Sequence, residues 1–189
     1  RKIIQPISNS MAIPINIEDL LNKRKIESNR IEFKKGWNPD KIYRTICAFA
    51  NDFDNIGGGY IVVGIEEEER TGIAKRPVTG VPIEALNDIQ KDMVGYNNKI
   101  EPYYMPRIDV QEVDGKSVLV IWAPAGVNRP YNVRERVTAK QSPSKWYIRS
   151  GTSTIEAKGE VLDELREMAN RTPFDERGNE RIEISDISP

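Results

Sequence analysis

The sequence predicts an α+β domain: a mixed β-sheet packed with three to four helices. Amphipathic helical stretches and short β-branched runs follow one another along the chain, which favours a fold that mixes both elements. In the middle, Asp114-Gly115 separates two apolar runs and predicts a β-hairpin. The 189 residues suffice for one domain, whose core buries roughly two-thirds of the surface of the unfolded chain.

The first third of the chain predicts helix, strand and helix. Asn16 can cap a helix over residues 17–25, and residues 30–34 alternate polar and apolar side chains as a strand does. Asn38 as cap and Pro39 at the first helical position begin a longer helix. Apolar residues then recur at helical spacing, which predicts a buried stripe formed by Ile42, Ile46, Phe49 and Phe53.

The rest of the chain predicts further strands and two helices. Residues 60–65 are a continuous β-branched run, typical of a strand buried on both faces. A long helix follows Pro82, and a final helix covers residues 159–170. The remaining predicted strands are residues 107–113, 116–124 and 145–149.

The predicted boundaries divide the chain into an N-terminal extension (1–16), the domain itself (17–171) and a polar linker or tail (172–189). The tail lacks a clean period, and we expect it to lead toward a C-terminal domain of the same protein. The first ten residues read as an upstream extension, because the stretch from Met11 also resembles a natural start. No apolar run reaches the length of a membrane span, so we expect a cytoplasmic protein that contacts no membrane.

Composition excludes several chemistries. The chain contains no histidine and one cysteine, so histidine-based triads, histidine-ligated zinc and an intramolecular disulfide are impossible within it. The net charge of −1 gives no overall attraction to nucleic acid, and any basic surface must be local. Cys47 lies among apolar residues and predicts a buried thiol, whereas Asn51 suggests a helix cap or a group that orients a partner.

Three consecutive glycines, Gly57 to Gly59, precede the strand at residues 60–65. A Walker loop needs glycines between a strand and a helix, followed by Lys and Ser or Thr, and this order is absent here. The glycines therefore predict a turn that needs positive φ angles.

Four glutamates are candidate metal ligands: Glu27 and Glu32 around the first strand, and Glu66 and Glu67 beyond the strand at 60–65. Carboxylates from separate strand ends suit Mg²⁺ or Mn²⁺, which can activate water against a phosphodiester without histidine. The alternative is that the Glu66 to Glu69 run is a solvated turn.

Residues 128–149 carry six basic side chains against a single acidic one, Glu135. Basic residues interleaved with the aromatic side chains of Tyr131, Trp146 and Tyr147 suit phosphate contacts and base stacking. Lys34 is a further candidate phosphate contact or a solvated charge, and Arg149 is alternatively structural. The predicted nucleic-acid contacts are Lys34, Arg129, Arg134, Arg136, Lys140, Lys145 and Arg149.

Three stretches together resemble the AlbA-type domain of the Schlafen family, also called divergent AAA-4: "ESNRIEFKKGW", "ICAFANDFDNIGGGYIVVGIEEE" and "WYIRSGTSTIEA". The resemblance covers residues 17–171. It implies an α+β fold and a nucleic-acid-related role, and bacterial members are described as DNA-binding transcriptional regulators. In Schlafen nucleases, two glutamates five residues apart and a later aspartate bind metal and cleave RNA. Glu27 and Glu32 match that pair, but the third position holds Glu66 or Glu67 instead of aspartate.

The leading hypothesis is that the chain is the nucleic-acid-binding domain of a transcriptional regulator and has no catalytic activity of its own. DNA is the preferred ligand of this hypothesis. The first alternative is a Mg²⁺- or Mn²⁺-dependent endoribonuclease that acts on structured RNA through the four glutamates. The second alternative is a protein-interaction or assembly domain, and a homo-oligomer is compatible with each hypothesis. The nucleases join two such lobes, whereas this chain has one, which favours binding over cleavage.

Overall fold

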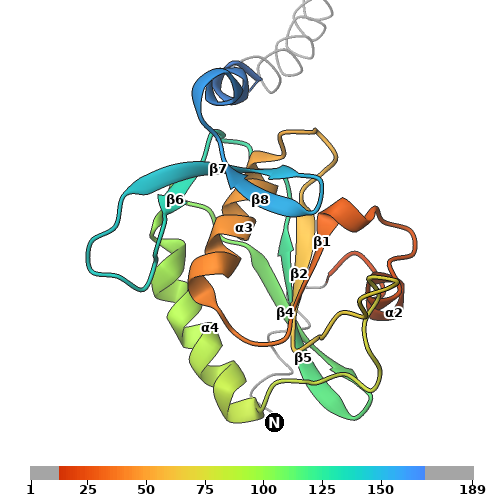
Figure 1. The fold of residues 1–189 in the computed structure, drawn as a ribbon. Coiled ribbons are helices and arrows are strands. Elements are labelled where there is room, and N and C mark those ends of the chain that lie inside the picture. The colour runs from red at the N-terminus through yellow and green to blue at the C-terminus, as the bar shows by residue number, and fades with distance from the viewer. Residues whose placement is uncertain (1–12, 169–189) are drawn as a thin grey trace, which may run out of the picture.

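The computed structural model describes residues 13–168, which form two four-stranded sheets with a helix between them (Figure 1). The first sheet has the order β1-β2-β5-β4 and the second the order β3-β6-β7-β8. The α+β class predicted from the sequence is confirmed, although the strands divide into two sheets. The predicted tail lies outside the described residues.

The first sheet is mixed, as predicted. β1 (Ile31–Lys34) runs parallel to β2 (Gly59–Val63), whereas β5 (Lys116–Ala123) and β4 (Arg107–Val113) are antiparallel to their neighbours. Every residue of β2 is buried, because α3 covers one face of the sheet, and residues 13–16 and α2 cover the other. The hairpin between β4 and β5 turns at Asp114 and Gly115, both with positive φ.

The second sheet is antiparallel, and most of it was not predicted. Its strands are β3 (Ile100–Glu101), β6 (Asn132–Arg134), β7 (Ser144–Ser150) and β8 (Ser153–Glu156). Only β7 has a recognisable sequence pattern. The other three strands are two to four residues long, too short for a period to be visible.

The central helix α3 (Pro39–Asn51) packs between the sheets and carries the core. Asn38 caps it by accepting a hydrogen bond from the backbone of Lys41, and Pro39 occupies its first turn, as predicted. The predicted apolar stripe is buried except for Phe53, which lies beyond the helix and is partly buried. The helix ends at Asp52, whose φ of 45° is left-handed.

The other helices cover the outside. α2 (Ile17–Leu21) is capped by Asn16 as predicted, a 3-10 turn η1 (Ser28–Arg30) precedes β1, and α4 (Ile83–Asn97) follows Pro82. Residues 159–168 form a helix that packs on Ile148 of β7 through Leu165. None of the described helices is long and apolar enough to cross a membrane.

The glycine run forms the predicted turn. Gly57 and Gly58 have φ angles of 98° and 83°, which favour glycine. A Cβ at Gly58 would lie 2.1 Å from the carbonyl oxygen of Ala123, so a larger residue has no room there. Arg30 donates hydrogen bonds to the carbonyl oxygens of both glycines, at 3.1 Å for Gly57 and 2.8 Å for Gly58. This turn is therefore tightly packed, and its glycines serve the fold.

Candidate nucleic-acid interface

Two of the predicted nucleic-acid contacts are buried in the protein. Arg129 donates from Nη1 to the backbone oxygens of Asn51 and Asp52, at 3.2 and 3.4 Å, and its side chain is almost fully buried. It therefore braces the end of α3. A buried guanidinium of this kind is not presented to a phosphate, so its side chain serves the fold.

Arg149 is also buried and joins the two sheets. Its Nη1 lies 3.1 Å from Oε1 of Glu32 and donates to Oγ1 of Thr154 at 2.9 Å. The guanidinium also lies over the ring of Phe49, with Cζ 4.8 Å from the ring centre. Burial lowers the pKa of Arg149, and the charge of Glu32 opposes that effect. These contacts agree with the structural alternative for this residue.

Two lysines of the predicted set are paired with carboxylates. Nζ of Lys34 lies 3.4 Å from Oε2 of Glu32, and Nζ of Lys145 lies 3.2 Å from Glu135 and 3.7 Å from Glu156. Each lysine is therefore partly neutralised by its neighbours. Neither contributes a free positive charge to the surface.

Of the predicted nucleic-acid contacts, three make no ion pair with the described residues: Arg134, Arg136 and Lys140, called here the loop cations. They flank or belong to the β6–β7 loop (residues 135–143). Arg134 donates from Nη1 to the backbone oxygen of Lys140 at 3.2 Å, and the backbone N–H of Arg136 donates to Oγ of Ser142 at 2.9 Å. The loop is thus held by a hydrogen bond from Arg134 and by one of its own, and the three loop cations all lie between residues 134 and 140.

The interleaved aromatic residues do not offer a stacking surface, contrary to the sequence-based expectation. Tyr131 and Tyr147 are only 2% and 5% exposed and belong to the central core. Trp146 is partly buried beneath Arg166, whose Cζ lies 5.1 Å from the ring centre. Neighbouring positions of β7 turn Tyr147 toward the core and Trp146 toward the last helix.

Two of the four candidate metal ligands, Glu32 and Glu67, line one hollow of about 400 Å³. Glu27 is exposed beside that hollow, immediately before Ser28, which also lines it. Glu66 instead pairs with Lys75 at 3.3 Å and Lys35 at 3.7 Å, and these lysines lower its pKa, Lys75 most. A lysine also meets Glu67, since Nζ of Lys23 lies 3.2 Å from its Oε2.

Three of the four candidate glutamates have basic partners. Glu32 lies between Lys34 and Arg149, and Glu66 and Glu67 each have a lysine partner. Across residues 13–168, no three acidic or cysteine side chains are grouped in a way that could hold a metal ion. Glu32, Glu66 and Glu67 are therefore engaged with basic neighbours, whereas Glu27 lies exposed beside the hollow.

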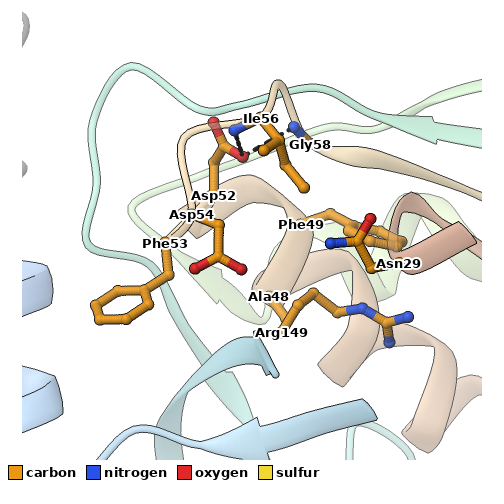
Figure 2. A pocket seen from close by; sticks show the side chains of 9 residues that line it. All are labelled: Asn29, Ala48, Phe49, Asp52, Phe53, Asp54, Ile56, Gly58 and Arg149. Carbon is orange, nitrogen blue, oxygen red and sulfur yellow. Dashed lines mark hydrogen bonds between the residues drawn. The ribbon is translucent and has the colours of Figure 1, made fainter. Parts of the chain in front are cut away.

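A second, much smaller pocket lies between the glycine turn and the second sheet (Figure 2). Its volume is about 10 Å³, the room of roughly one water molecule. The carboxylate of Asp52 above it accepts hydrogen bonds from the backbone N–H groups of Ile56, Gly57 and Gly58, at 3.0 to 3.1 Å. The pocket is too small for a nucleotide base, and it belongs to the tightly packed glycine turn.

The sequence analysis missed the role of Asn51. The side chain is fully buried, donates to the backbone oxygens of Tyr131 (3.0 Å) and Tyr147 (2.8 Å), and accepts from the N–H of Tyr131 (2.7 Å). Asn51 therefore ties α3 to β7 and to the residue before β6, and Asp52 is the residue at the helix end. An uncharged polar residue on a predicted apolar helix face was the available signal. Cys47 is buried as predicted, and burial raises its pKa to about 12.

Comparison with known proteins identifies the family of the chain. The family model described as Schlafen, AlbA_2 matches residues 27–158, more than half of the chain. No curated protein gives a significant match. The match begins at Glu27 and ends at Lys158, so it covers both sheets and α3. The chain belongs to the Schlafen AlbA_2 family.

Two solved structures are similar to the chain. The first is the DIP2311 protein from Corynebacterium diphtheriae, 21% identical, with a TM-score of 0.49; the match covers 74% of this chain and 28% of that protein. The second is the solution NMR structure of the N-terminal domain of an ATP-dependent DNA helicase RecG-related protein from Nitrosomonas europaea. It is 27% identical with a TM-score of 0.48, and the match covers 71% of this chain and 88% of that domain.

Proposed function

We propose that this domain binds nucleic acid through the β6–β7 loop, with DNA as the leading candidate ligand, and that it is the binding module of a transcriptional regulator. The observation that carries the proposal is the set of loop cations, three unpaired positive charges on a loop held in shape by its own hydrogen bonds. Cations placed in this way contact phosphates and release counterions from the nucleic acid. Membership of the Schlafen AlbA_2 family supports a nucleic-acid-related role.

The test is a charge reversal on the loop. Arg134→Glu combined with Arg136→Glu replaces two of the three loop cations, and we expect it to abolish binding to labelled duplex DNA and RNA in fluorescence anisotropy. Arg136 is exposed and Arg134 half-buried, and neither side chain belongs to the core, so the melting temperature stays nearly unchanged.

The matched control is Lys116→Glu combined with Arg107→Glu, which changes the net charge equally at two exposed residues of the first sheet, whereas the loop joins two strands of the second sheet. This control variant retains wild-type binding if the position of the charge matters. If both double variants lose nucleic-acid binding equally, only the net charge matters. That result would refute the assignment of binding to the β6–β7 loop.

A second candidate is a Mg²⁺- or Mn²⁺-dependent ribonuclease, and one observation favours it: Glu32 and Glu67 line the same hollow. Glu27, Glu32 and Glu66 or Glu67 would hold the ion, which would supply activated water for cleavage of a phosphodiester. Such a site requires Lys34 and Arg149 to release Glu32, because a cation competes directly with their positive charges.

The nuclease candidate is tested without relying on activity alone. Thermal melts with and without millimolar Mn²⁺ measure binding, because a bound ion raises the melting temperature. Glu67→Gln should remove that shift and also remove cleavage of labelled tRNA. A melting curve that Mn²⁺ leaves unmoved, together with intact tRNA, would exclude this candidate and leave the binding function standing.

A further inference from the structure

The β6–β7 loop is attached to the first turn of α3, although the two segments lie nearly a hundred residues apart in sequence. The carboxylate of Asp40 accepts hydrogen bonds from the backbone N–H of Thr138 at 3.1 Å and from its Oγ1 at 3.0 and 3.1 Å. One helical turn later, Nη1 of Arg44 donates to the backbone oxygen of Glu135. The loop therefore lies along the beginning of α3 (Figure 1).

These contacts bring two more cations next to the loop. Lys41 follows Asp40 directly, and Lys41 and Arg44 are three residues apart, which places them on neighbouring positions of the helix surface. Lys41 is exposed, and its ammonium group has no acidic partner among residues 13–168. Arg44 is half-buried and already touches the loop. Neither residue stands out in the sequence, where α3 reads as a core helix.

Two acidic side chains lie at this place. Asp40 accepts hydrogen bonds from Thr138 and keeps its charge, whereas Glu135 pairs with Lys145 at 3.2 Å. The positive charges that remain are those of the loop cations together with Lys41 and Arg44. Since the loop is fixed by hydrogen bonds to α3 and within itself, little ordering is needed when a ligand binds.

We infer that Lys41 and Arg44 of α3 and the three loop cations form one two-segment surface that takes the phosphate backbone of a nucleic-acid duplex. The inference rests on the proposed nucleic-acid function and specifies its ligand. Single-strand binding uses exposed aromatic rings on which bases stack, and the rings of the basic segment, Tyr131, Trp146 and Tyr147, are buried or covered. A surface that offers cations without stacking rings contacts phosphates and does not favour single strands.

Lys41→Gln tests this surface most cleanly, because the lysine side chain makes no hydrogen bond within the described residues and its loss leaves the helix cap intact. Binding to fluorescent duplexes of two unrelated sequences is measured by anisotropy over a range of salt concentrations. If Lys41 neutralises one phosphate, the log–log slope becomes less steep by about 0.9 and affinity falls about eightfold at about 0.1 M salt. Both sequences should be affected equally.

Lys116→Gln is the matched control, because this exposed lysine lies at the β4–β5 turn, away from the loop. It should leave the slope and the affinity unchanged. Asp40→Asn is the complementary variant: the amide oxygen still accepts from Thr138, but a negative charge disappears, and we expect binding to tighten about two- to threefold.

The outcomes separate this inference from the proposed function. If the wild type binds duplex and the Arg134→Glu with Arg136→Glu variant does not, but Lys41→Gln behaves as Lys116→Gln does, the loop binds nucleic acid and α3 does not. Tighter binding to single strands than to duplex, or strong preference for one sequence, also overturns the inference and leaves the proposed function intact. A wild-type protein that binds no nucleic acid would refute both the inference and the proposed function.

Discussion

Arg149 of β7 and Glu32 of β1 form an ion pair with 3.1 Å between Nη1 and Oε1, and this pair links the two sheets. The side chain of Arg149 is 8% exposed and that of Glu32 is 22% exposed, so the pair is largely removed from water. It also keeps Glu32 engaged with a cation. From the sequence alone, Arg149 was predicted to contact a phosphate and Glu32 to bind a metal ion.

Removal of Arg149 should destabilise the domain without acting on a binding surface. Breaking a buried pair on one side costs about 3–5 kcal/mol, and because Glu32 keeps Lys34 as a partner we expect the lower end, about 3 kcal/mol, for Arg149→Met. Glu32→Gln should cost less, since the amide oxygen still accepts a hydrogen bond from Arg149. Urea unfolding measures both variants, and an Arg149→Met variant as stable as the wild type would refute the structural role.

Asn51→Ala should be among the most destabilising substitutions in the chain. The change removes the partner of the buried N–H of Tyr131 and of the buried carbonyl oxygen of Tyr147, at a cost of about 1–3 kcal/mol each, and leaves the carbonyl oxygen of Tyr131 with only the weak donor Sγ of Cys47 at 3.3 Å. We therefore expect a loss of at least about 2 kcal/mol in urea unfolding. The control is Asn98→Ala, in an exposed residue just after α4, which should cost well under about 1 kcal/mol. Similar effects of the two substitutions would contradict the bridging role of Asn51.

Asp114 should make stability depend on pH in the acid range. Its hydrogen bonds from Arg76, at 2.7 and 2.9 Å, and from the backbone of Val78 lower its pKa from 3.8 to about 2. Because the folded state binds this proton less tightly than the unfolded state, the stabilisation is complete above about pH 4 and disappears as the pH falls to about 2. Asp114→Asn should remove that part of the pH dependence in denaturant titrations. If Asp114→Asn leaves the pH dependence of stability in the acid range unchanged, the pairing of Asp114 with Arg76 is contradicted.

Local sequence patterns were sufficient for the elements with a clear period. The cap at Asn38, the stripe from Ile42 to Phe49 and the turn at Asp114-Gly115 all lie where the pattern predicts. The short strands β3, β6 and β8 carry no such pattern, because their place is set by pairing with distant strands. The division into two sheets was invisible for the same reason.

The candidate site could be predicted only in part, because charge in a sequence does not reveal its partner. Arg129 and Arg149 lie within a basic segment but are buried against α3 and Glu32, residues about 80 to 120 positions away. The contact between Thr138 and Asp40 likewise spans 98 residues. Such pairings come from tertiary packing, and they determine which basic residues stay free.

The most direct test of the central claim is the salt dependence of wild-type binding to a duplex. If three loop cations each neutralise one phosphate, the log–log slope of affinity against salt is about −2.7, and with Lys41 and Arg44 it approaches −4.5. We therefore predict binding at about 50 mM salt with a slope of about −3 or steeper, for DNA and RNA duplexes alike. No binding at that salt, or affinity that does not change with salt, would contradict the account.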